Sequence, residues 1–477
     1  MLNNHNYKRF DNSKLPVPEE LVCGATTDKD KYWKWVSYNS KVCVGKIKSD
    51  KVSLKYFGYR KSLESFCSSL VYQLCIVENS NCEPCPLKYT CSSYISKKPI
   101  NTNITFADLF CGCGGLSLGF ENVGLIPKVA MDIDPWFLLT YMYNRPKLDI
   151  DYLATDISDW IFQKKHIKKW NIDIISGGVP CQSFSTANRQ PLKKDSRGYL
   201  YKSLLLAAKM IMPKLILIEN VSGMLKKYDD IINDLDKLDY KTTYMKLNSS
   251  HFGIPQNRRR IFFVALNRKS ITKRKQKFKI FHETVKDQEN SKSVLLREAI
   301  SDLPPLVAHR KNYDTSFNNN ISGRSLIIHD ISNASEYVKK INYNRSLGAL
   351  FNHKARYNNP RDVEIFGLLK EGDNSLSKSI QNLNPYKNRN NIFIDKYFKL
   401  KYDDICKTIT AHMRYDCNMY IHPEQARGLT AREAARVQSF PDNYVFLGNF
   451  QRTYQQIGNA VPPKLASVLG NAIKEIL

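Results

Sequence analysis

ITFADLFCGCGGLSLGF, residues 104–120, decides the fold, because an apolar run, a glycine-rich turn and a helix-like stretch follow one another directly. Glycines in such a turn allow a tight strand-to-helix connection and close approach of a ligand to the backbone. Asp132 ends the next apolar run, twenty residues after Gly112, where nucleotide-binding α/β folds place an acceptor for ribose hydroxyls. The spacing is not Gly-x-Gly-x-x-Gly and no Gly-Lys-Ser/Thr follows, so the turn favours a nucleoside with a small charged tail over a phosphate.

Short apolar runs alternate with helix-like stretches along the chain from Asn103 to Asn267. We expect strands at 104–110, 128–132, 172–176, 215–218, 241–247 and 261–266, and helices at 116–122, 136–143, 201–212 and 229–238. Strands and helices that alternate at this spacing form βαβ units. The sequence therefore predicts an α/β fold with a mainly parallel, doubly wound, Rossmann-like sheet.

Three polar motifs follow or precede predicted strands, near the edge where open α/β sheets place their sites. They are PCQ at Pro180–Gln182, ENV at Glu219–Val221 and QNRRR at Gln256–Arg260. Arginines at alternate positions of a strand can face one side, where they suit anions and carbonyl oxygens. A lone cysteine is more often inert than catalytic, so the interest of Cys181 depends on these neighbours.

The composition is that of a globular protein, with 42% hydrophobic and 25% charged residues. The 72 lysines and arginines outnumber 45 acidic residues, which gives a formal net charge of +27. So large a surplus is typical of proteins that bind nucleic acid. A solubility charge or the bias of an AT-rich genome is the alternative explanation. We find no signal-peptide core and no apolar run of membrane-spanning length, and therefore expect a cytoplasmic protein.

The motifs, taken in order, resemble those of the DNA (cytosine-5) methyltransferases over Asn103–Asn267 and Gln425–Ala466. The matching motifs are DLFCGCGG at 108–115, PCQ at 180–182, ENV at 219–221, QNRRR at 256–260, REAARVQSFP at 432–441 and QIGNAVP at 456–462. Six moderately specific motifs in the family's order leave little room for chance agreement. One departure is Val179, which stands where the family usually has a first proline.

The resemblance implies methyl transfer from S-adenosyl-L-methionine to C5 of cytosine in double-stranded DNA. Cys181 would add to C6, which makes the ring enamine-like and lets C5 attack the methyl sulfonium. Glu219 would stabilise charge on the ring through N3 and the exocyclic amine. Arg258, with Arg260 as a second candidate, would hold the base carbonyl and the Cys181 loop. The target cytosine must leave the base stack to reach these groups.

By the same resemblance, a set of residues from several strand ends contacts S-adenosyl-L-methionine. The set is Phe110, Gly112, Gly114, Gly115, Asp132, Ile133, Asp156, Pro180 and Asn459. The family usually has an aromatic residue at the Ile133 position, so this chain lacks the usual stacking ring there.

The resemblance also divides the chain. We expect an N-terminal Cys-rich extension over 1–100, a catalytic S-adenosylmethionine-binding domain over 101–270, a smaller irregular target-recognition domain over 271–420 and a C-terminal return to the catalytic domain over 421–477. The strand–helix alternation stops at the basic run Lys273–Lys279, and the polar chain beyond it is too long for a loop. We expect a monomer that works with a restriction endonuclease, as in bacterial restriction–modification systems.

Four cysteines of the N-terminal extension form a tight cluster with metal-ligand spacing: Cys75, Cys82, Cys85 and Cys91. The spacing resembles the iron–sulphur loop of helix-hairpin-helix DNA glycosylases. Four thiolates can hold a 4Fe-4S cluster, which we place first, or a tetrahedral zinc, which we place second. Unligated buried thiols are the third interpretation, and Cys67 is an alternative ligand.

Two other functions compete with DNA methylation. Some relatives of the family methylate tRNA, but the long basic segment at 271–420 favours DNA because the tRNA-directed members have a shorter one. A non-catalytic DNA-binding protein on the same scaffold would lose the nucleophile or the glycine loop, and this chain keeps both.

Overall fold

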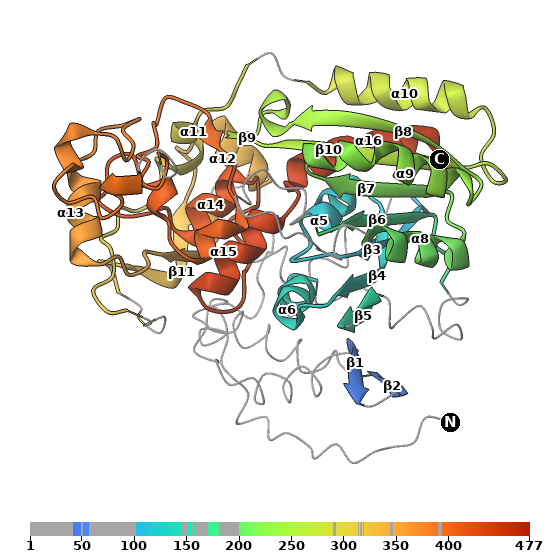
Figure 1. The fold of residues 1–477 in the computed structure, drawn as a ribbon, viewed down its shortest axis with the longest axis horizontal. Helices are drawn as coiled ribbons and strands as arrows, with labels where there is room; N and C mark the ends of the chain where they lie inside the picture. Colours follow the sequence, from blue (N-terminus) through green and yellow to red (C-terminus); the bar gives the residue numbers. More distant parts are fainter. Residues whose placement is uncertain are drawn as a thin grey trace, which may run out of the picture.

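The computed structural model describes residues 102–477, with gaps at 146–149, 155, 158–169, 181–199, 290–291, 313, 315–316, 318, 344–346 and 390–393. It also describes the backbone of two earlier strands, β1 (Val42–Lys48) and β2 (Lys51–Tyr56). Figure 1 shows two lobes: one is built on a large sheet, and the other consists of short helices, strands and turns beside it.

The sheet has nine strands in the order β2-β1-β5-β4-β3-β6-β7-β10-β8. Besides β1 and β2 they are β3 (Thr105–Leu109), β4 (Ile126–Asp132), β5 (Asp151–Ala154), β6 (Ile174–Gly178), β7 (Leu215–Asn220), β8 (Tyr240–Asn248) and β10 (Arg259–Asn267). β5, β4, β3, β6 and β7 are parallel, whereas β10 lies antiparallel between β7 and β8. The predicted α/β class is confirmed. β5 is missing from the predicted strands because four residues carry too little periodicity.

Helices cover both faces of the sheet. They are α5 (Gly115–Asn122), α6 (Pro135–Tyr143), α8 (Leu200–Ile211), α9 (Tyr228–Asp236), α10 (Arg274–Asp287) and α16 (Pro463–Ile476). In β7, Ile216 and Ile218 join a buried cluster with α8 and α9, while Leu215 and Leu217 join another with α5, α10 and α16. Because β7 is buried on both faces, its first four residues, Leu215–Ile218, are continuously apolar rather than alternating.

The structure differs from the expectation at the basic run Lys273–Lys279, which does not open an irregular segment. Most of this run lies in α10, and Phe281 and Val285 of that helix are fully buried beside α16. Lys277 donates to the backbone carbonyl of Ile476 at the end of α16. The intervening lysines obscure the apolar spacing of the helix, which is why the sequence does not reveal it.

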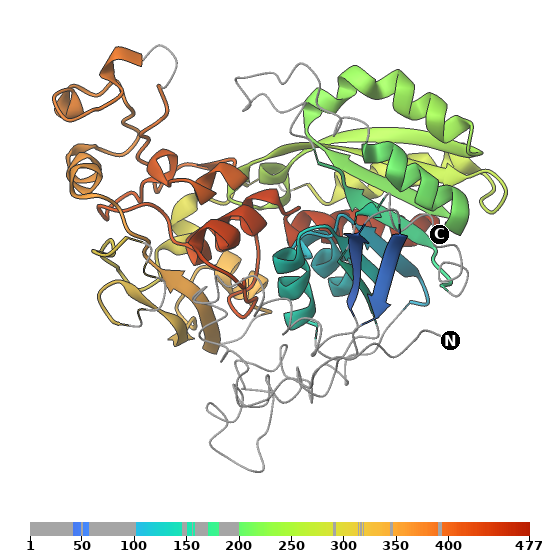
Figure 2. The same cartoon turned by 60° about the horizontal axis from the view of Figure 1, so that its bottom comes forward.

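The second lobe is assembled from short elements around its own core. These are α11 (Leu296–Ile300), β11 (Gly323–Asp330), α12 (Glu336–Ile341), β12 (Leu347–Lys354), α13 (Pro360–Leu368), η6 (Lys378–Ile380), η7 (Lys387–Arg389), β13 (Cys406–Lys407), η8 (Ala411–Arg414) and η9 (Asn418–Tyr420). Two later helices, α14 (Ala431–Val437) and α15 (Phe450–Asn459), join the same core. Figure 2 shows them between the lobe and the sheet, so residues 421–477 contribute to both cores through α14, α15 and α16.

Candidate active site

The predicted site residues gather at one edge of the sheet, where the parallel strands end. In chain order, Phe110–Gly115 follows β3, Asp132 ends β4 and Ile133 follows it, Asp156 follows β5, Pro180 follows β6 and Glu219 is the next-to-last residue of β7. Cys181 lies outside the described residues, although the strand that leads to it and Pro180 before it are described. The sheet thus brings the predicted cofactor residues and Glu219 to the same edge.

The glycine loop has an open face. Gly112 and Gly114 adopt left-handed φ angles of 54° and 88°, and a Cβ added at Gly112 would meet nothing within 4 Å. Asp132 adjoins this face: its carboxylate accepts hydrogen bonds from the backbone N–H of Gly112 at 2.9 Å and of Asp134 at 2.8 Å. Each bond leaves its oxygen a second lone pair, so Asp132 can still accept two ribose hydroxyls.

Apolar and C-terminal groups border the same loop. Ile133 is 66% exposed directly after Asp132, which leaves an apolar surface at the end of β4. A Cβ added at Gly115 would lie 2.4 Å from the carbonyl oxygen of Val461, so the backbone after Asn459 packs against the loop. The open space at Gly112, the acid and the uncovered apolar side chain together fit a nucleoside with a base.

The groups beneath the loop are buried and structural. Asp108 at the end of β3 accepts hydrogen bonds from the hydroxyls of Ser117 in α5 and Ser176 in β6, and burial raises its pKa to about 7. Burial also raises the pKa of the Cys113 thiol to about 12 and that of Cys111 well above its usual range. The two loop cysteines are 6% and 1% exposed, so they are small buried residues rather than reactive thiols.

Glu219 and Arg260 form an ion pair beside the start of the Cys181 loop. The Nε atom of Arg260 lies 2.9 Å from Oε1 of Glu219, and the two side chains are 14% and 9% exposed. A Cβ added at Gly178 would lie 3.2 Å from Oε2 of Glu219. Asn220 donates to the carbonyl of Val179 at 3.0 Å, which ties the end of β7 to the residue before Pro180.

The two candidate arginines of the QNRRR motif have different surroundings. Arg258 is 1% exposed and donates to the backbone carbonyls of Ile409 at 2.8 Å and Gly458 at 3.1 Å. It stands between the short strand β9 (Gln256–Asn257) and β10, so the alternation within β10 does not set its direction. Arg260 lies within β10, two residues before Phe262, the register partner of Glu219. Arg260, rather than Arg258, therefore shares a face of the sheet with Glu219.

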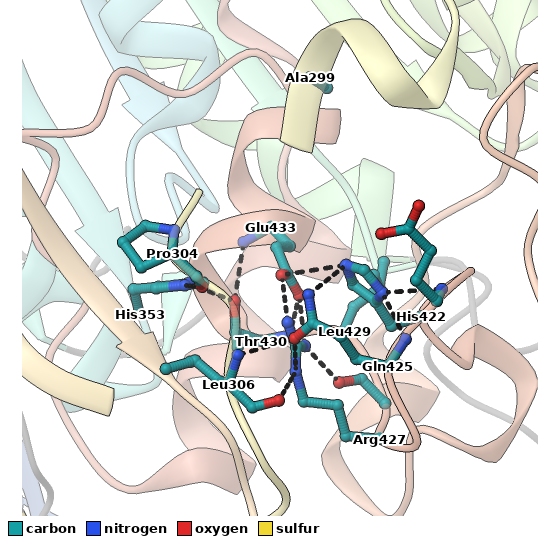
Figure 3. Close-up of polar contacts among 12 residues, drawn as sticks. Ala299, Pro304, Leu306, His353, His422, Gln425, Arg427, Leu429, Thr430 and Glu433 are labelled. Carbon is teal, nitrogen blue, oxygen red and sulfur yellow. Dashed lines mark hydrogen bonds and ion pairs between the residues drawn. The ribbon is translucent and has the colours of Figure 1, made fainter. Parts of the chain in front are cut away.

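A buried polar network holds the start of α14 (Figure 3). Glu433 accepts two hydrogen bonds from Arg427, at 2.7 and 2.8 Å, and one from the backbone N–H of Thr430 at 2.7 Å. His353 lies 3.2 Å from the Thr430 hydroxyl, and His422 lies 3.7 Å from Glu433. All five side chains are buried, so this part of the REAARVQSFP motif stabilises the second lobe.

The two arginines of the REAARVQSFP motif are fully buried. Arg436 pairs with Asp442 at 2.7 Å and with Asp302 at 2.6 Å, which joins α14 to the end of α11. Arg432 donates to the carbonyls of Phe351 and Pro441. Sequence reasoning identified this motif by resemblance, and the structure gives each of its arginines a scaffolding contact.

Acid is expected to destabilise the protein through His353 and His422. Burial lowers the pKa of both to about 4, whereas in the unfolded chain they would titrate near 6.5. As pH falls from about 6.5 to 4, the unfolded state therefore binds protons that the folded state does not, and each histidine lowers the free energy of unfolding by about 3 kcal/mol. Asp108 and Asp132 act in the opposite sense over the same range, because burial raises the pKa of each to about 7. Urea unfolding of the wild type and of a histidine variant at a series of pH values therefore isolates the histidine contribution as a difference.

The control for the pH effect is His422→Asn. Nδ1 of His422 accepts hydrogen bonds from the backbone N–H groups of Glu424 and Gln425, and an asparagine oxygen can take over this role without titrating. Between pH 6.5 and 4, the free energy of unfolding of the variant should fall by about 3 kcal/mol less than that of the wild type, because the His422 contribution is absent. A slope equal to that of the wild type would contradict the assignment.

The predicted cysteine cluster at Cys75, Cys82, Cys85 and Cys91 lies outside the described residues. Within the described ranges, no group of three or more histidine, cysteine or acidic side chains is arranged to hold a metal ion. No helix in those ranges is long and apolar enough to cross a membrane.

Comparisons with known proteins identify the family. The sequence profile described as "C-5 cytosine-specific DNA methylase" matches residues 104–475. The chain is 32% identical to the type II methyltransferase M.DdeI of Desulfomicrobium norvegicum, over 77% of this chain and 87% of that protein. It is 29% identical to the type II methyltransferase M1.HphI of Haemophilus parahaemolyticus, over 81% of this chain and 91% of that protein.

A solved structure supports the fold. It is a crystal structure described as a DNA modification methyltransferase encoded within an E. coli prophage, with a TM-score of 0.56 and 24% identity. The match covers 78% of this chain and 99% of that one.

Proposed function

This chain belongs to the C-5 cytosine-specific DNA methylase family, and we propose that it methylates C5 of a flipped-out cytosine within a specific double-stranded DNA sequence, with S-adenosyl-L-methionine as the donor. The observation that carries the proposal is the Glu219–Arg260 pair, which adjoins the start of the Cys181 loop at the sheet edge that also holds the glycine loop. Neighbouring strand ends thus supply the proposed nucleophile, an ion pair that can bind the base, and a site for a nucleoside.

The chemistry assigned to the chain proceeds through a covalent bond. The Cys181 thiolate adds to C6 of cytosine, and the electron pair of the C5–C6 bond becomes available at C5. Arg260 would donate to the base carbonyl, and Glu219 would hydrogen-bond N3 and the exocyclic amine, so both oppose the charge that forms on the ring. When bound, S-adenosyl-L-methionine would supply the electrophilic methyl group, whose bond to sulfur breaks as the bond to C5 forms, with the thioether as leaving group. Loss of the C5 proton then restores the double bond and expels Cys181.

The cofactor assignment depends on the glycine loop and Asp132. The backbone at Gly112 is open, Asp132 keeps free acceptor capacity, and Ile133 offers apolar surface to a base. We assign the other contacts to Phe110, Gly114, Gly115, Asp156, Pro180 and Asn459. A second lobe and a net charge of +27 support binding of a DNA duplex, which we assign to the part of residues 271–420 that follows α10, since α10 itself packs on the sheet.

The biological role follows from the relatives. Both relatives named above are type II methyltransferases, and they match most of the chain. We propose that this enzyme, acting as a monomer, protects host DNA from a partner restriction endonuclease that recognises the same sequence.

The decisive assay uses labelled S-adenosyl-L-methionine with either DNA or tRNA, and Cys181→Ala beside the wild type. The proposal predicts label in DNA alone, and mapping of the label to 5-methylcytosine at one recurrent sequence. Label in tRNA would favour an RNA methyltransferase. Binding to DNA without label in either polymer would favour a non-catalytic protein.

Replacing each arginine by lysine is expected to separate their roles. Arg260→Lys keeps a positive charge near Glu219 but loses the planar guanidinium, so kcat should fall roughly 10- to 100-fold while the melting temperature changes little. Arg258→Lys cannot reach both Ile409 and Gly458, so the free energy of unfolding should fall by about 2 kcal/mol while turnover of the folded enzyme persists. If Arg258→Lys lowered kcat and Arg260→Lys lowered the stability instead, the catalytic and structural roles of the two arginines would be exchanged.

The N-terminal cysteine cluster remains a prediction, with a role in DNA binding or folding. Protein purified without oxygen should contain iron and acid-labile sulphide, or else zinc. Cys82→Ser with Cys85→Ser should remove the metal, whereas Cys23→Ser, outside the cluster, should retain it. Wild-type protein with neither metal would eliminate the prediction.

A further inference from the structure

Arg145, directly after α6, is a buried cation with four partners around the glycine loop. Its side chain is 2% exposed and pairs through Nε with Glu121 of α5 at 2.6 Å. Its guanidinium donates to the carbonyl of Gly114 at 3.0 Å, to the carbonyl of Tyr141 at 3.1 Å and to the hydroxyl of Tyr444 at 3.0 Å. None of these groups belongs to the catalytic or cofactor-binding residues assigned above except Gly114.

Tyr444 extends this contact to the neighbouring peptide. It comes from the segment after α14, is 4% exposed and donates its hydroxyl hydrogen to the carbonyl of Cys113. The carbonyls of Cys113 and Gly114 belong to the two peptide planes on either side of the Gly114 Cα atom. Arg145 and Tyr444 together therefore fix both planes around a residue that has left-handed backbone angles.

The left-handed conformation of Gly114 matters because it sets the turn into α5. A Cβ at this position would lie 2.6 Å from the ring of Tyr141 and 2.8 Å from the guanidinium of Arg145, so both groups pack directly on the Gly114 backbone. Gly114 also donates to the carbonyl of Cys111 at 2.9 Å, which closes the loop around Gly112. Rotation of either peptide plane would displace the open face at Gly112.

The segment that carries Tyr444 is attached along α6 at three further points. Asn144 exchanges two hydrogen bonds with Val445, and the Thr140 hydroxyl accepts from the backbone N–H of Leu447. Asp134, the N-cap of α6 next to Ile133, pairs with Arg452 at 2.5 Å. Residues 444–452, here called the α6 clamp, thus connect the core of the second lobe to both ends of the helix beside the nucleoside site.

We propose that Arg145 and Tyr444 are positioning residues for the methyl donor, which hold the Cys113–Gly114–Gly115 backbone in the conformation that binds it. This inference rests on the proposed function of the loop as the S-adenosyl-L-methionine site. It also assigns a task to the α6 clamp: the second lobe completes the cofactor site by holding a loop of the first.

The test is Tyr444→Phe, with Tyr337→Phe as the matched control. Both tyrosines are 4% exposed in the same core, and each donates its hydroxyl hydrogen to a backbone carbonyl: Tyr337 bonds Arg436 of α14 at 2.5 Å, not a residue of the glycine loop. Tyr444→Phe should raise the KM and Kd for S-adenosyl-L-methionine roughly 5- to 10-fold, as expected for one buried hydrogen bond. The KM for DNA and kcat at saturating donor should stay within about twofold of the wild type.

The control should lower the melting temperature to a similar extent and leave the donor KM unchanged, which separates positioning from general destabilisation. Arg145→Lys should also raise the KM for the donor. In the double variant of Arg145→Lys and Tyr444→Phe, the increase in this KM should be smaller than the product of the two single increases, because both side chains act on one loop. A donor KM unchanged in Tyr444→Phe, or raised equally in Tyr337→Phe, would overturn the inference. A wild type that binds no S-adenosyl-L-methionine would overturn the proposed function itself.

Discussion

Replacing Cys181 by alanine is expected to lower the rate of methyl transfer by more than about 10⁴-fold, because the nucleophile makes the only covalent bond between enzyme and base. C5 of cytosine reacts with the methyl sulfonium only after the thiolate has added at C6. The donor site, formed by other strand ends, should be intact in the variant. Single-turnover assays with saturating donor and DNA measure the rate, and donor and duplex binding are measured in parallel.

A duplex with 5-fluorocytosine at the target position tests the same bond directly. After addition and methylation, fluorine at C5 cannot leave as a proton does, so wild-type enzyme should remain attached to DNA on a denaturing gel. Cys406→Ala is the matched control, since Cys406 is 2% exposed in β13 and its thiol pKa is raised to about 12 by burial. Trapping should persist in this control and disappear in Cys181→Ala. Trapping by Cys181→Ala would assign the nucleophile to another residue.

Glu219→Gln is expected to reduce kcat by roughly 10²- to 10³-fold, the usual consequence of removing one preorganised group that stabilises charge in a transition state. Glutamine has the same shape, but it carries no charge for Arg260, whose Nε lies 2.9 Å from Glu219 in the wild type. The loss should appear in the chemical step rather than in the affinity for donor. Single-turnover rates compared with donor Kd values separate the two.

The control for this change is Glu283→Gln, which removes a carboxylate on the exposed side of α10. Its single-turnover rate should equal that of the wild type. If Glu219→Gln methylates DNA within threefold of the wild-type rate, Glu219 does not act on the base, and the pair with Arg260 is structural.

Local sequence was sufficient for the framework of the site. The apolar runs at β3, β4 and β6 depend on neighbours in the chain, and the structure has strands at these places. The glycines after β3 likewise form the expected loop. Carboxyl ends of parallel strands meet at one edge, so order along the chain already implied which residues would come together. The proposed nucleophile and cofactor residues come from this kind of information.

The tertiary structure decided what periodicity cannot encode. Arg258 and Arg260 belong to the same motif, yet their partners differ because only Arg260 lies within β10. Arg258 donates to the carbonyls of Ile409 and Gly458, whereas Arg260 pairs with Glu219. Arg145 and Tyr444 are separated by 299 residues and carry no motif, although they hold the glycine loop together. A local sequence pattern determines whether a segment is a strand or a helix and on which face each side chain lies. The groups that a side chain then contacts depend on segments that folding brings from elsewhere in the chain.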